Sequence, residues 1–238
     1  MKQTMCTCLD YLDDVAAYWV GQHFPRPAVA LGPPCESQYC SWCGQTVQEH
    51  IHCTCGNRPI AWSRVVRLGA YEPPLSTCIL RGKYARWFEV LELIGTRLGT
   101  RIRGCVPANA VVVPMPMPYI RWWFRGINHT GVLSKSLAKS AGLKRRNLLL
   151  RKETPPQAGL TASNRMKLKV NTVRPYPWVH LRGRPVVLVD DVLTTGRSLE
   201  VATRALRLAG ASTVTIAVAA VTNPPEGSKK LQSPSITT

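Results

Sequence analysis

The sequence contains no long hydrophobic run. Its longest apolar segments, such as residues 214–221, are shorter than ten residues, whereas a membrane-spanning helix needs about 20. The first residues also lack the apolar stretch of a secretory signal, because Asp10, Asp13 and Asp14 stand where that stretch would lie. These absences exclude a transmembrane helix and a cleaved signal, so we expect a cytoplasmic protein with no membrane insertion.

Acidic residues are scarce. The 238 residues include 13 Asp and Glu against 31 Lys and Arg, which gives a formal net charge of +18. Between residues 101 and 189 there are 17 Lys and Arg and a single acid, Glu153. Such a field attracts polyanions, so nucleic acid and phosphorylated small molecules are the expected partners. The alternative is a basic surface that serves solubility alone.

Disulfides are not expected either, because the nine cysteines are an odd number and the expected compartment is reducing. Five of the nine lie between residues 35 and 55. Cys40 and Cys43 form a Cys-x-x-Cys pair, and Cys53 and Cys55 follow as Cys-x-Cys.

Four thiolates at this spacing suit a tetrahedral structural zinc, which a short segment without its own core needs as a cross-link. The exact ligand set stays open, since nearby residues offer substitutes, and free thiols in a loop are the alternative. The substitute ligands are Cys35, His50 and His52.

The domain organisation of the chain can be predicted from changes in composition along the sequence. An apolar content of 45% is typical of a globular protein. We expect an N-terminal extension over 1–34, a zinc ribbon over 35–62, an α/β domain over 63–222, and a mobile tail rich in Pro, Ser, Thr and Lys over 223–238.

Periodicity within the α/β domain predicts alternating strands and helices, which favours a parallel sheet with right-handed crossovers. Residues 151–184 show almost no periodicity, and a loop of that length is usually functional or disordered. The expected helices cover 85–100, 130–141 and 196–208, and the expected strands cover 110–115, 148–150, 186–189 and 214–221.

The clearest motif is Val-Val-Leu-Val-Asp-Asp-Val-Leu-Thr-Thr-Gly-Arg-Ser-Leu at residues 186–199. It predicts a buried strand with two carboxylates, Asp190 and Asp191, at its carboxyl end, where open α/β sheets bind ligands. A turn through Gly196 then starts a helix whose free amides form a phosphate cradle. Because the two acids would repel a phosphate, we expect them to face neutral groups such as ribose hydroxyls.

This motif resembles the phosphoribosyl pyrophosphate (PRPP) signature of type I phosphoribosyltransferases. The resemblance implies that Asp190 and Asp191 bind the ribose hydroxyls and that the following turn binds the 5-phosphate. Ser198 stands where threonine is usual and keeps the hydroxyl. The residues expected to bind the phosphate are Thr194, Thr195, Gly196, Arg197 and Ser198.

Further segments resemble the ComF/GntX-type proteins of this superfamily. They include Leu-Gly-Ala-Tyr at 68–71 with Pro74-Leu75 and Lys83-Tyr84, Val-Pro-Met-Pro at 113–116, Arg-Gly-Ile-Asn-His at 125–129 and Pro-Pro-Gln at 155–157, together with the cysteine ribbon. Two positions depart from the pattern: His129 replaces a glutamine, and the second cysteine pair is one residue shorter than usual.

The ComF resemblance implies a diphosphate loop that includes Pro114 and Met115, with Arg121 and Arg125 as phosphate clamps. Contact with a DNA backbone, or simple solvation, is the alternative for the two arginines. The aromatic residues at 122–124 either stack on bases or belong to the core.

Two functions follow as expectations. One is a ComF-like protein that binds PRPP with Mg²⁺ and single-stranded DNA during competence-related DNA uptake, with a competence helicase as a partner. The other is a transferase that moves 5-phosphoribosyl from PRPP to a nucleobase. No catalytic base and no base-recognition motif can be assigned from the sequence.

Overall fold

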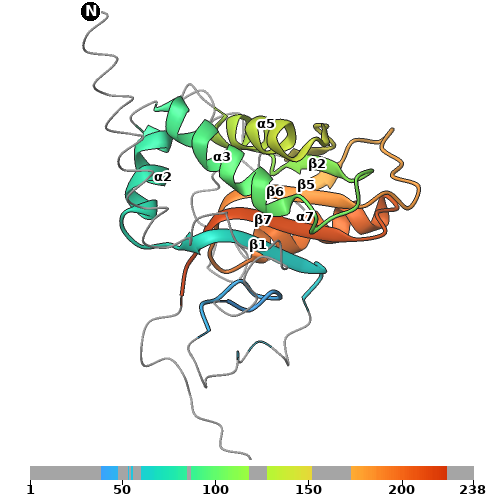
Figure 1. Ribbon diagram of the computed structural model, residues 1–238. Helices are drawn as coiled ribbons and strands as arrows, with labels where there is room; N and C mark the ends of the chain where they lie inside the picture. The colour runs from blue at the N-terminus through green and yellow to red at the C-terminus, as the bar shows by residue number, and fades with distance from the viewer. Residues whose placement is uncertain are drawn as a thin grey trace, which may run out of the picture.

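The architecture comes from a computed structural model, which describes residues 39–47, 53, 55, 60–84, 87–117, 128–151 and 173–223 (Figure 1). Several sequence predictions lie outside the described residues. These are the N-terminal extension, the tail from residue 224, most of the 151–184 loop, the aromatic residues at 122–124, and Arg121, Arg125, Cys35, His50 and His52.

A parallel sheet of five strands forms the centre of the molecule, in the order β1-β7-β6-β2-β3. Val dominates its central strands, as expected where both faces are covered. The bounds are Arg64–Ala70 for β1, Val111–Pro114 for β2, Lys144–Arg145 for β3, Val186–Leu193 for β6 and Val214–Val221 for β7.

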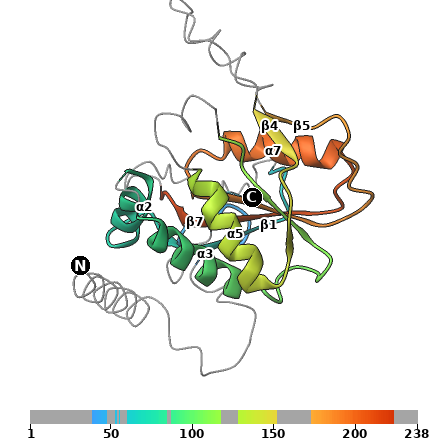
Figure 2. The same ribbon diagram turned by 90° about the horizontal axis from the view of Figure 1, so that it is seen from above.

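Helices cover both faces of the sheet (Figure 2). On one face lie α2 (Leu75–Tyr84), α3 (Phe88–Ile102) and α5 (His129–Ala141). On the other face lie α7 (Arg197–Leu208) and a two-stranded antiparallel hairpin of β4 (Leu149–Arg151) and β5 (Val173–Pro175).

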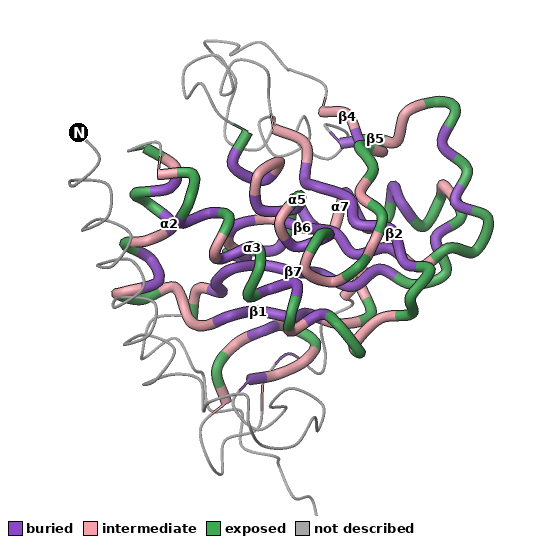
Figure 3. Tube along the Cα trace, turned by 45° about the horizontal axis from the view of Figure 1, so that its top comes forward, coloured by how far each residue is buried: buried purple, intermediate pink, exposed green. Residues whose placement is uncertain are grey.

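Two apolar cores result, one on each side of the sheet, and most residues of the central strands are buried (Figure 3). Successive strand residues point to opposite faces, so Val187 and Val189 pack under α3 and α5, while Val186 and Leu188 pack under α7. All eight residues of β7 are buried.

Close packing against α3 sets the position of α5. A methyl group at Gly95 or Gly99 of α3 would come within 2.5 Å of a backbone oxygen of α5, at Leu133 and Leu137 respectively. The two helices therefore touch backbone to backbone. This contact places the first residue of α5, His129, over the carboxyl end of the sheet.

The predicted parallel α/β fold is confirmed, and the last strand has the predicted bounds. The strand β6 runs four residues beyond its predicted end, because its pairing with β7 continues through Leu193. The helix α2 and the strands β1, β3 and β5 were not predicted individually. Short strands such as β3, with two residues, offer no periodicity to detect.

In the part of the chain that the structure describes, every helix is too short or too polar to cross a bilayer.

Candidate functional site

The loop after β6 has the geometry of an anion site. Thr194 and Thr195 are exposed, Gly196 has φ of +75°, and α7 then begins at Arg197. No side chain caps this helix. The amides of its first turn therefore have no partner within the helix, and together with the helix dipole they favour a phosphate.

Two separate features of this turn require a glycine at position 196. Its positive φ strains any residue with a side chain, and a Cβ would lie 3.0 Å from the ring of Trp62. The Trp62 indole donates a hydrogen bond of 2.7 Å to the backbone oxygen of Trp42. The loop thus rests against a ring that is itself tied to the cysteine segment.

Asp191 lies in the second half of β6 and is held by two side chains from other elements. Its Oδ2 atom forms an ion pair of 2.8 Å with Lys83 Nζ, at the end of α2, and accepts a hydrogen bond of 2.8 Å from His129 Nε2. Burial alone would raise the pKa of this carboxyl, but the His129 hydrogen bond and the Lys83 charge lower the pKa to about 2. Asp191 is therefore ionised and fixed in orientation.

Asp190 has the opposite electrostatic environment. Burial, followed by the neighbouring charge of Asp191, raises the pKa of Asp190 to about 7. Its Oδ1 atom accepts a hydrogen bond of 2.9 Å from the backbone amide of Asp191. Near neutral pH the pair therefore carries one permanent charge, on Asp191, and one carboxyl that is close to its titration point.

The end of β2 lies beside the two acids. Pro114 pairs with Val189, and the amide of Met115 donates a hydrogen bond of 2.8 Å to the Val189 oxygen. The Thr130 hydroxyl donates to the Met115 oxygen at 3.1 Å. Asn128 caps α5 by accepting from the Gly131 amide at 2.9 Å. The structure thus brings the start of the predicted diphosphate loop next to Asp190.

Lys83 and His129 were not predicted as site residues from the sequence. Their role depends on contacts between α2, α5 and β6, which are distant in the chain. Only family resemblance drew attention to these positions, through the Lys83-Tyr84 pair and the departure at His129. The sequence carries no local pattern that joins either residue to Asp191.

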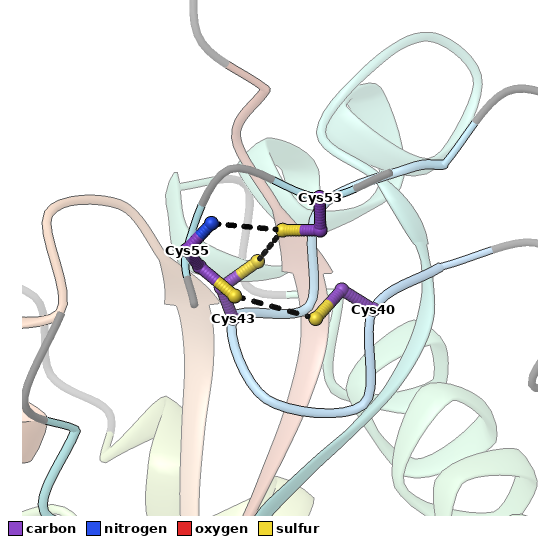
Figure 4. Close-up of side chains that lie close together, drawn as sticks. All are labelled: Cys40, Cys43, Cys53 and Cys55. Atoms are coloured by element: carbon purple, nitrogen blue, oxygen red, sulfur yellow. Dashed lines mark hydrogen bonds between the residues drawn. The ribbon is translucent and has the colours of Figure 1, made fainter. Parts of the chain in front are cut away.

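The four predicted zinc ligands come together (Figure 4). Their ligand atoms all lie within 4.8 Å of one another, with 3.5 Å between the sulfurs of Cys40 and Cys55 and 3.1 Å between those of Cys43 and Cys53. A tetrahedral zinc with bonds of about 2.3 Å needs sulfurs about 3.8 Å apart. All four are free cysteines, so the cluster can hold a metal ion such as zinc.

Residues 39–47 attach this cluster to the open edge of β1. The Val65 amide donates to the Ser41 oxygen at 2.7 Å. Gly44 lies so close to β1 and β7 that a Cβ would meet Val65 and Val221 at 2.9 Å. Arg67 donates to the Thr46 hydroxyl at 2.8 Å. The cysteine segment thus covers an exposed strand edge that could otherwise pair with another chain.

Comparisons with known proteins agree with this geometry. The profile of the phosphoribosyl transferase domain matches residues 161–236. Competence protein F of Haemophilus influenzae is 28% identical over 193 residues, which cover 75% of this chain and 82% of that protein. DNA utilization protein YhgH of Escherichia coli K12 is 29% identical over 191 residues, which cover 74% and 81%. The chain is therefore similar to ComF-like proteins of the phosphoribosyltransferase type.

Among solved structures, a hypoxanthine-guanine phosphoribosyltransferase from Bacillus anthracis resembles this chain at 11% identity and a TM-score of 0.39. The match covers 58% of this chain and 71% of that one.

Proposed function

We propose that the carboxyl edge of the sheet binds PRPP. The 5-phosphate takes the uncapped start of α7, at residues 194–198, and the ribose hydroxyls donate to Asp190 and Asp191. The diphosphate lies along the segment that begins at Pro114 and Met115. Mg²⁺ would accompany PRPP and would neutralise part of its charge.

The observation that carries this proposal is the fixed carboxylate of Asp191. Lys83 and His129 hold one of its oxygens at 2.8 Å each and leave the other oxygen for a ligand hydroxyl. The ionised Asp191 carboxylate is an oriented acceptor for hydroxyl groups, and the uncapped start of α7 beside it suits a phosphate. Together they fit a ligand that carries both hydroxyls and a phosphate. A pure polyanion would be repelled by Asp191.

We further propose that this ligand site belongs to a protein of competence-related DNA uptake that binds single-stranded DNA. Support comes from the names of the two relatives and from the net charge of +18. A competence helicase is then a partner to be sought, because a strand must be delivered to the protein.

Replacement of both acids tests the PRPP site. Asp190→Asn with Asp191→Asn preserves side-chain volume but removes the charge, and we expect calorimetric titration with PRPP and Mg²⁺ to show no binding. The exposed Glu92→Gln on α3 is the matched control and should bind PRPP as the wild type does. Wild-type affinity in the double variant would refute the site.

Single-strand binding by the same double variant is the internal check. An oligonucleotide backbone gains nothing from either acid, so its affinity should stay nearly unchanged. Loss of both ligands together would instead indicate a folding defect, which a thermal melt of the variant would reveal.

Transfer of the phosphoribosyl group to a nucleobase is the second candidate, favoured by the phosphoribosyl transferase domain match. Fold resemblance alone does not carry an activity. Release of diphosphate from PRPP on addition of a purine or pyrimidine base would establish it, and binding without release for every common base would assign PRPP a regulatory role.

A further inference from the structure

Acidic side chains are confined to one half of the described structure along the strand direction. The six acids in the described part of the chain all lie in the carboxyl half of the sheet or at helix ends beside it: Glu72, Glu89, Glu92, Asp190, Asp191 and Glu200. Exposed basic side chains gather at the opposite, amino edge, where the strands begin and α3, α5 and α7 end: Arg103, Lys139, Lys144, Arg182, Arg184 and Arg207.

An aromatic pair with one exposed ring lies beside this basic edge, in the light-orange loop that precedes β6 (Figure 1). Trp178 is 73% exposed and stacks on Tyr176, with ring centroids 5.0 Å apart and planes 18° from parallel. Trp178, Arg182 and Arg184 help to line a hollow of about 400 Å³. A large ring left open to solvent on one face is a platform on which an unpaired base can stack.

Arg182 is held in a conformation that suits glycine better. Its φ of +48° makes it the one non-glycine residue with positive φ in the described part of the chain. The neighbouring backbone fixes this turn, because the amides of Leu181 and Gly183 donate to the oxygens of Ala209 and Gly210 at 2.8 Å each. Strained residues held in rigid turns cluster at functional sites, so the Arg182 guanidinium is a candidate ligand-binding group.

We propose that single-stranded DNA crosses the amino edge of the sheet, with a base stacked on Trp178 and with phosphates bound by Arg182 and Arg184. The ring supplies a sequence-tolerant stacking surface, and the arginines neutralise the backbone. This inference rests on the DNA-binding half of the proposed function and adds its location.

The two ligands then occupy opposite ends of one strand. The eight residues of β6 span about 25 Å from Val186 to Leu193. The arginine turn precedes β6 and the phosphate loop follows it. A bound strand therefore leaves the PRPP site open, and both ligands can be held at once.

The sharpest test is Arg182→Gly, measured by anisotropy of a labelled 20-residue oligo-dT and by thermal unfolding. Glycine relieves the backbone strain, so the melting temperature should stay equal or rise, while the affinity should fall about tenfold and the salt slope should decrease by about 0.7. Arg97→Ala, an exposed charge on α3, is the control and should change affinity less than twofold.

Trp178→Ala tests the stacking step separately. Affinity for oligo-dT should fall at least fivefold with an unchanged salt slope, and Trp178→Phe should recover most of it. A duplex of the same length should be insensitive to Trp178→Ala, because its bases are already stacked. PRPP with Mg²⁺ at saturation should leave oligo-dT affinity unchanged within twofold.

The outcomes distinguish the proposed location of the DNA site from the proposal that the protein binds DNA at all. Wild-type affinity in both Arg182→Gly and Trp178→Ala, or competition between PRPP and oligo-dT, would overturn the location while DNA binding itself stands. A wild-type protein that binds no oligo-dT would overturn both.

Discussion

The carboxyl edge of the sheet and the cysteine cluster represent two ways of building a site. At the carboxyl edge, contacts within the protein already hold the key groups, because Lys83 and His129 fix Asp191 and Trp62 packs on Gly196. In the cluster, four thiols lie within 4.8 Å of one another, an arrangement that a bound metal ion would cross-link. The first site is preorganised, whereas the second depends on its ligand. Each prediction below tests that difference.

Removal of metal should have the largest effect. Freshly purified, reduced protein should contain about one zinc per chain by elemental analysis. Chelation or Cys43→Ser should free the 39–55 segment, since structural zinc in small domains contributes about 10 kcal/mol or more. Limited proteolysis should then cut this segment first, while the sheet stays folded. Reduced protein without metal would contradict the assignment.

Gly196→Ala should have the next largest effect, at the preorganised site. A Cβ there is strained by the positive φ and comes 3.0 Å from Trp62. We expect a loss of about 1–3 kcal/mol in the free energy of unfolding and a weaker affinity for PRPP. Gly104→Ala also has a positive φ but meets nothing within 4 Å, so it separates strain from the clash. Equal losses in the two variants would show that Trp62 does not matter.

The two acids should contribute to stability with opposite pH dependence. Asp191 has a lowered pKa, so its stabilisation is present above about pH 4 and is lost as the pH falls towards 2. Asp190 has a pKa raised to about 7, so the stability it contributes when protonated is lost as the pH rises from about 4 to 7.

Asp190→Asn should therefore stabilise the protein by about 1–3 kcal/mol at pH 8 and much less at pH 4. Denaturant unfolding at the two pH values measures this difference. Asp191→Asn should instead destabilise the protein at pH 8, because Lys83 and His129 lose a buried partner. If both variants were stabilised at pH 8, or both destabilised, the opposite electrostatic environments of the two acids would be contradicted.

His129→Gln should have the smallest effect. Glutamine can still donate a hydrogen bond towards Asp191, whereas His129→Ala removes it and leaves a gap at a buried position. Affinity for PRPP should fall about tenfold in the alanine variant and less than threefold in the glutamine variant. Equal losses in the two variants would indicate that His129 does more than orient Asp191.

Local patterns made much of this molecule predictable. The strand at 214–221 is apolar enough to be identified without its neighbours, and the turn at Gly196 carries its own glycine signature. The cysteine spacing likewise predicted a cluster that the structure assembles. Lys83 and His129 could not be found this way, because their contact with Asp191 depends on α2 and α5 meeting β6. The extension of β6 to Leu193 depends in the same way on its pairing with β7.

Hydrogen exchange with and without PRPP and Mg²⁺ tests the central claim most directly. PRPP should protect the backbone amides of residues 194–198 and of the segment after β2, where phosphate oxygens accept their hydrogen bonds. The amino-edge loop at 178–184 should exchange at the same rate with and without the ligand. Protection confined to the amino edge, or no change at residues 194–198, would contradict a PRPP site at the carboxyl edge of the sheet.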